Sequence, residues 1–344
     1  MTSFRLPSAI FPDNAITRAE HTYQTRSARK FRTWRRWINR TVMWLAIALS
    51  LIHFLGLLVA SLTLRDPSPI TRLLNPLPNL LLLFASFYHL YLMFQTIVLS
   101  SNSITREKEF QTWELLVLTG INARQIVRGK WWATVQRQVP YYLRLAVLRI
   151  GATAALAISF AAIFSYRSNY YQSQFQLPHP LTLVIAALLA VAFTFANLAL
   201  SAACGVMGSA VSKRSTFAIA RGIANQIVIS CVPALVVFFV ITRPYFYTIS
   251  SPYRSIYTTL TSAIFSLVDN GVNLLASPMY PGYLYNDTQV YTPYAPIAVD
   301  WMIAAVICLA LYVLLIWFAL WRAEKRTVSA LATPVDSKPR IQLP

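Results

Sequence analysis

Long uncharged apolar blocks alternate with short polar segments along this chain. Six blocks approach or exceed the roughly 20 apolar residues that a helix needs to cross a bilayer. They predict membrane spans at 41–64, 80–105, 140–165, 181–211, 222–242 and 301–321. The short-range alternation typical of transmembrane β-strands is not found in the sequence. The pattern therefore predicts an all-α integral membrane protein with six transmembrane helices.

Composition and charge agree with this class. Of the 344 residues, 56% are hydrophobic and 12% are charged, which is about half the charged fraction of a typical soluble domain. The net charge of +19 could indicate a nucleic-acid partner, so the distribution of Lys and Arg decides its meaning. These residues number nine in 1–40, five in 104–130, three in 213–221 and five in 322–344, against two, one and two in 65–79, 166–180 and 243–300. The alternation is the positive-inside pattern of six spans with both ends in the cytosol, and we expect no nucleic-acid partner.

The order of the segments predicts one membrane domain with polar ends. The first apolar block begins after about 40 residues, too late for a cleavable signal peptide. Residues 1–27 are expected to be a loosely ordered cytosolic N-terminus, residues 28–322 the six-span domain, and residues 323–344 a cytosolic tail. The third block is the weakest, because Arg149 leaves only 150–165 strictly uncharged. We expect a multi-pass protein of a cell membrane, most simply the inner or plasma membrane of a bacterium or archaeon.

A basic amphipathic segment precedes the first span. Phe31, Trp34 and Trp37 fall near one face of a helix over 28–40, and basic residues that include Arg35 and Arg36 crowd the other faces. This pattern predicts an N-terminal helix that lies in the membrane interface. The alternative interpretation is a basic anchor that flanks the first span.

Two further features concern the later spans. Ser201, Gly205 and Ser209 recur at every fourth residue of the fourth block, a small-residue stripe that favours close helix packing within or between subunits over a substrate path. Residues 243–300 carry nine of the 18 tyrosines and form the largest predicted external region. Because tyrosine favours membrane interfaces, we expect an external helical loop between spans five and six.

The sequence carries little catalytic or ion-coupling chemistry. The six blocks contain no Asp or Glu, whereas ion-coupled transporters usually place carboxylates within the membrane. The zinc-hydrolase and serine-hydrolase motifs HExxH and GxSxG are missing, and Gly129–Lys130 fails as a P-loop because Trp131 follows. We therefore expect no metal, no cofactor and no enzymatic activity on this chain. A membrane enzyme built from scattered polar residues stays an alternative.

The segment 104–130, ITREKEFQTWELLVLTGINARQIVRGK, stands out among the polar regions. Thr112 can cap a short helix whose apolar contacts come from Trp113 and 115–118, and Gly120 suits its C-terminal end. Acidic residues edge this helix, namely Glu107, Glu109 and Glu114. An anionic inner leaflet would repel them, so a protein partner is favoured over a lipid surface.

This segment resembles the cytosolic coupling region of ATP-binding-cassette (ABC) transporter permeases of the type-2 exporter class. The matching residues are Ile104, Glu107, Lys108, Glu109, Thr112, Glu114, Leu115, Leu116, Gly129 and Lys130. The sequence departs from the family pattern at 110–111, where glycine is usual, and at 119–120, where threonine–proline is common. Residues 208–216 are similar to the family's turn between spans four and five, and the resemblance covers about 28–322.

The resemblance implies a function that composition and spacing do not. It implies a permease subunit that pairs with a second copy or a paralogue and is driven by a separate ABC ATPase subunit, which binds the ATP and Mg²⁺. A coupling helix between spans two and three would seat in a groove of the ATPase. Glu107, Glu109 and Glu114 would then make polar contacts, and Trp113, Leu115 and Leu116 would fill the groove. The alternative function is a non-transporting membrane scaffold or assembly factor.

Overall fold

The computed structural model describes residues 15–27, 33–63, 77–110, 112, 121–168, 179–241, 263–264, 267 and 299–332. Within these ranges the chain is helical and contains no strand. The long helices are α1 (Ala15–Ser27), α2 (Thr33–Thr63), α4 (Leu77–Glu109), α6 (Ala123–Ser168), α7 (Pro180–Val211), α8 (Ser215–Ile241) and α11 (Val299–Ala332).

Five of the described helices are long and apolar enough to cross a membrane. The candidate spans are Thr41–Thr63, Leu80–Glu109, Pro180–Val211, Ser215–Val232 and Trp301–Val328. They make the chain a multi-pass helical membrane protein. The predicted third span lies within α6, a continuous helix of 46 residues that passes through Pro140. A sixth span there stays a prediction, as does the external helical loop, most of which lies outside the described residues.

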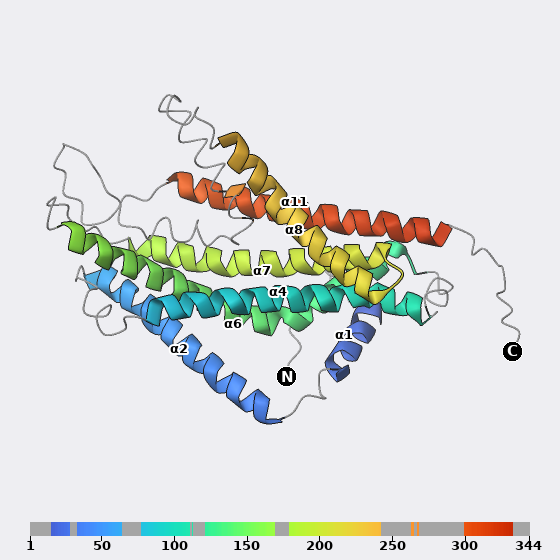
Figure 1. Cartoon of the computed structure of the whole chain (residues 1–344), viewed down its shortest axis with the longest axis horizontal. Helices are drawn as coiled ribbons and strands as arrows, with labels where there is room; N and C mark the ends of the chain where they lie inside the picture. The colour runs from blue at the N-terminus through green and yellow to red at the C-terminus, as the bar shows by residue number, and fades with distance from the viewer. Residues whose placement is uncertain are drawn as a thin grey trace, which may run out of the picture.

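Helix α7 occupies the centre of the bundle and contacts α4, α6, α8 and α11 (Figure 1). Helices α4, α7 and α11 end, and α6 and α8 begin, at the same end of the bundle, where α1 also lies (Figure 1). This end carries the described basic residues of 104–130, 213–221 and 322–326, and we call it the basic end. One bundle end therefore collects residues from the first described helix to the last.

Small residues allow α4, α7 and α8 to approach closely near the basic end. Ser201, Gly205 and Ser209 are all buried in α7. A Cβ atom on Gly205 would lie 1.9 Å from the Ser100 hydroxyl oxygen and 2.8 Å from the Ile97 carbonyl oxygen of α4. The hydroxyl oxygen of Ser209 accepts hydrogen bonds from two backbone amides of α4, at 3.0 and 2.9 Å. The stripe therefore lies at a contact between helices of one chain.

The outer faces of the helices are apolar and exposed, as expected for surfaces that contact lipid. On α2, Trp44 and Leu45 are each 66% exposed, while Leu57 on the opposite face is 2% exposed. Leu57 belongs to a core cluster with residues of α7 and α11, among them Phe193 and Tyr312. In a bilayer, exposing these apolar side chains carries no free-energy penalty, because lipid tails are as apolar as the protein core.

The N-terminal region differs from the expectation of loose order. Residues 15–27 form helix α1, which packs against α6. Its packed face is polar, with Thr17, Glu20 and Gln24 each less than 5% exposed. These side chains recur at three- to four-residue spacing and therefore share one helical face. A polar helix that pairs its buried groups with a partner can be ordered without an apolar stripe.

The predicted interfacial helix at 28–40 is, from Thr33 onward, the first part of α2. Helix α2 runs without a break into the first span, so the two predicted elements are one helix. Trp34, Arg35, Arg36 and Trp37 lie in it, and Phe31 lies outside the described residues. Whether this part lies in the membrane interface stays a prediction.

Candidate functional site

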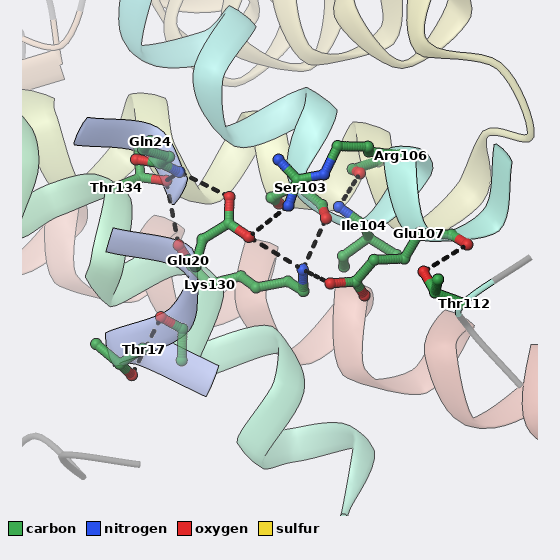
Figure 2. Close-up of polar contacts among 12 residues, drawn as sticks. Thr17, Glu20, Gln24, Ser103, Ile104, Arg106, Glu107, Thr112, Lys130 and Thr134 are labelled. Atoms are coloured by element: carbon green, nitrogen blue, oxygen red, sulfur yellow. Dashed lines mark hydrogen bonds and ion pairs between the residues drawn. The ribbon is translucent and has the colours of Figure 1, made fainter. Parts of the chain in front are cut away.

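Four charged side chains meet at the basic end where α1, α4 and α6 come together. We call Glu20, Arg106, Glu107 and Lys130 the charge cluster, and Figure 2 shows Lys130 between the two carboxylates. The Lys130 ammonium group donates to Glu107 at 2.5 Å, to the Ser103 carbonyl oxygen at 2.7 Å and to Glu20 at 3.4 Å. The Arg106 guanidinium lies 3.1 Å from Oε2 of Glu20, the same oxygen that Lys130 contacts. The cluster thus links three helices by ion pairs.

The cluster is buried to a degree that is unusual for ionised groups. The side chain of Lys130 is 1% exposed and that of Glu20 is 4% exposed, while Glu107 and Arg106 are 14% and 21% exposed. Two carboxylates and two cations balance to zero net charge. Burying a charge is tolerated when it is paired and hydrogen-bonded, and removing one partner of such a pair costs about 3–5 kcal/mol. The position of α1 is therefore tied to the ends of α4 and α6.

Uncharged contacts extend the cluster along α1. The Gln24 amide donates to the Glu20 carboxylate at 3.0 Å and to the Thr134 hydroxyl at 3.4 Å. The Thr17 hydroxyl donates to the carbonyl oxygen of Gly129 at 3.3 Å. The Arg106 guanidinium lies 3.6 Å above the ring centroid of Tyr23, an arrangement that favours a cation–π interaction. Nearly two turns of α1 are fixed in this way.

The segment between α4 and α6 is anchored at both of its ends. The Glu107–Lys130 pair joins the last turn of α4 to the first part of α6, across the residues where the coupling helix is predicted. The Glu109 carboxylate accepts hydrogen bonds from the Ser215 backbone amide at 2.7 Å and the Ser215 hydroxyl at 2.8 Å. It thereby caps the start of α8, where a helix has amides without intrahelical partners. The segment consequently emerges from a braced junction of α4, α6 and α8.

A second ion-paired contact braces the far side of α6. The Arg128 guanidinium donates to the Glu324 carboxylate at 2.8 Å, and Arg124 lies 3.9 Å from the same carboxylate. Glu324 belongs to α11, so this contact joins the beginning of α6 to the end of the last helix. The two sets of contacts lie on different sides of α6.

The structure divides the predicted coupling residues into two groups. Glu107 and Glu109 contact other parts of the same chain, and the exposed Thr112 donates its hydroxyl to the Glu107 carbonyl at 3.3 Å. The remaining predicted residues lie outside the described part of the chain, namely Trp113, Glu114, Leu115, Leu116 and Gly120. The partner contacts expected of these residues therefore stay predictions.

Sequence reasoning did not find the contribution of α1. The partners of Lys130 and Arg106 include Glu20, which is 110 and 86 positions away in the chain. One available signal was the shared helical face of Thr17, Glu20 and Gln24. Because that face is polar, its helical spacing is as typical of a helix exposed to solvent as of one that packs against α6.

Known proteins and metal-binding patterns give no further assignment. A scan against protein-family models, a search of curated proteins and a search of solved structures found no match. Among the described residues, no group of three or more His, Cys, Asp or Glu side chains could hold a metal ion. The cluster's four charges pair with one another, so the arrangement is suited to holding helices in register.

Proposed function

We propose that this chain is the permease subunit of an ABC exporter, working as a dimer with a second permease and driven by a separate ATPase subunit. The observation that supports it most is the braced junction from which 111–120 emerges. In this proposal the segment is the coupling helix, and its residues Trp113, Glu114, Leu115 and Leu116 contact the ATPase. The ATPase holds ATP and Mg²⁺, and this chain contributes the membrane path.

The charge cluster gives the proposal a physical route from the ATPase to the membrane. A force on the coupling segment acts on the end of α4 and the beginning of α6 together, because Glu107 and Lys130 hold them to each other. Glu109 passes the same displacement to α8 through Ser215. Separating the pair would leave two buried charges without their counter-charges, so in this proposal the junction moves as a unit. Helices that are joined in this way can rock rather than bend locally.

The contacts of two acidic residues refine the roles that the resemblance implies. Glu107 is held by Lys130, and Glu109 by Ser215. We therefore assign them to bracing the junction, and we assign the contact with the ATPase to Glu114 and the apolar residues beside it. A charge reversal at Glu109 would disturb the start of α8 and is a poor test of partner binding.

The test is co-purification of an ATPase with the tagged full chain from its native membranes. Wild type is compared with Glu114→Arg and Trp113→Ala, and ATP hydrolysis is measured in the eluate. Asp336→Arg applies the same charge change in the C-terminal tail and serves as the matched control. We expect wild type and the control to retain an ATPase whose activity the two coupling variants reduce at least tenfold, with unchanged size-exclusion profiles.

Two results would count against the proposal. If the wild type retains no ATPase, the transporter assignment fails and a scaffold or assembly role takes its place. If Glu114→Arg and Trp113→Ala retain as much ATPase as the control, the coupling segment is not the contact.

A further inference from the structure

A groove lies at the basic end between the beginning of α6 and the end of α11. This open groove has a volume of about 500 Å³ and is lined by Asn122, Arg124, Trp321, Glu324, Lys325 and Val328. It lies on the opposite side of α6 from α1 and shares no lining residue with the charge cluster. It is therefore a separate feature of the surface.

The charges that line the groove do not cancel. Glu324 is 16% exposed and is held by Arg128 at 2.8 Å, which neutralises its charge locally. Arg124 is 62% exposed and lies farther from that carboxylate, at 3.9 Å. Lys325 adds a second exposed cation, positioned 4.1 Å above the ring centroid of Trp321. The groove is thus positively charged, with an aromatic wall.

The position of the groove along α11 matches the surface of a membrane. The apolar block 301–321 ends at Trp321, and the next residues include the cations Arg322, Lys325 and Arg326. Trp317 and Trp321 are stacked at 6.2 Å between ring centroids, and both are more than a third exposed. Tryptophan concentrates where a span meets the headgroup region. A tryptophan at the end of an apolar block, followed by cations, is the pattern expected where a span meets the lipid headgroups.

We propose that this groove binds the phosphate headgroup of an anionic lipid from the leaflet on the basic side. Arg124 and Lys325 contact the phosphate, and Trp321 packs against the glycerol and the first part of an acyl chain. Basic pockets between transmembrane helices on the cytoplasmic side are suited to such headgroups. An acidic protein segment would satisfy the cations but would leave Trp321 facing lipid. The inference does not depend on the proposed transport function.

Native mass spectrometry of the purified full chain in detergent tests the proposal. The probes are dioleoyl phosphatidylglycerol, dioleoyl phosphatidylcholine and inorganic phosphate, each titrated separately. We expect wild type to prefer phosphatidylglycerol and Arg124→Gln/Lys325→Gln to lose affinity for it by about fivefold for each removed cation, or about 25-fold for the pair. Lys213→Gln/Arg214→Gln removes two exposed cations from the loop before α8 and should change the affinity less than about twofold.

A variant that is expected to bind lipid more tightly tests whether misfolding explains a loss of affinity. Glu324→Gln keeps the shape and hydrogen-bonding capacity of the side chain and removes its negative charge, so the affinity for phosphatidylglycerol should rise several-fold. A damaged protein would not show that gain.

Each of the other outcomes overturns the proposal. Equal affinities of Arg124→Gln/Lys325→Gln (the groove variant) and Lys213→Gln/Arg214→Gln (the loop variant) for phosphatidylglycerol would mean that net charge alone determines lipid binding. Phosphate binding as tight as phosphatidylglycerol binding would assign the groove to a soluble anion. If the groove variant keeps its lipid affinity but releases a co-purifying ATPase, the groove is a protein interface.

Discussion

Replacing Lys130 by methionine keeps an unbranched side chain of similar length and removes the charge at the centre of the cluster. In the wild type its ammonium group contacts Glu107 at 2.5 Å, the Ser103 carbonyl oxygen at 2.7 Å and Glu20 at 3.4 Å. Glu20 retains Arg106 at 3.1 Å in the variant. Glu107 retains no ion pair within the described part of the chain. The loss in the free energy of unfolding should therefore come mainly from the unpaired charge of Glu107.

The expected magnitude follows from the burial of Glu107. Removing one partner of a buried ion pair costs about 3–5 kcal/mol, because the remaining charge has lost its counter-charge and most of its water. The Glu107 side chain is 14% exposed, so some hydration persists and we expect the lower limit, about 3 kcal/mol. Glu107→Gln should cost less, about 1–2 kcal/mol, since Lys130 keeps Glu20 and the Ser103 carbonyl oxygen.

The double variant Lys130→Met/Glu107→Gln separates ion pairing from packing. It leaves no uncompensated charge at position 107, so its cost should be about 2 kcal/mol below the sum of the single variants. The assay is unfolding of the purified protein in mixed micelles with increasing dodecyl sulfate, followed by far-UV circular dichroism. Lys213→Met, in the exposed loop before α8, should stay within about 0.5 kcal/mol of wild type.

Two results would refute the reasoning about the cluster. A cost of Lys130→Met below about 1 kcal/mol would mean that the charge is not effectively buried. Strict additivity of the two substitutions would mean that Lys130 and Glu107 do not interact in solution.

Two other substitutions test local parts of the junction. Gly205→Ala places a Cβ atom 2.8 Å from the Ile97 carbonyl oxygen. Since that backbone atom cannot turn aside, we expect a loss of about 1–3 kcal/mol in the same micelle assay; a loss below about 0.5 kcal/mol would show that α4 and α7 separate freely. Glu109→Ala removes the acceptor for the Ser215 amide, so hydrogen exchange at 215–218 should accelerate while α11 is unaffected. Unchanged exchange at 215–218 would show that the cap is not formed in solution.

The close contact of α7 with α4 illustrates a feature that the sequence indicated and the structure placed. The spacing of Ser201, Gly205 and Ser209 marks a face suited to close approach. It does not say which helix approaches, because any helix in the bundle could use that face. The structure brings Ser100 and Ile97 of α4 to Gly205, which identifies the contact.

The role of Glu109 shows why the site was harder to predict than the spans. In the sequence it is one of three acidic residues beside a predicted coupling helix. In the structure its carboxylate caps α8 through Ser215, 106 positions away, and its predicted contact with a partner stays a prediction. A carboxylate suits a helix start in the same chain and a partner protein equally well, so the residue type does not distinguish the two.

The membrane class and the division of the chain into apolar spans and basic connections were determined by the sequence by itself. These properties are local, because the length of an apolar run must match the bilayer thickness and the charge of a connection sets its side. The tertiary structure decided three other features: the packing of α1 against α6, the burial of Lys130 and the pairing of Glu20 with two cations. Those features depend on which distant polar groups meet away from water, and the free energy of a buried charge depends on its partners rather than on its neighbours in sequence.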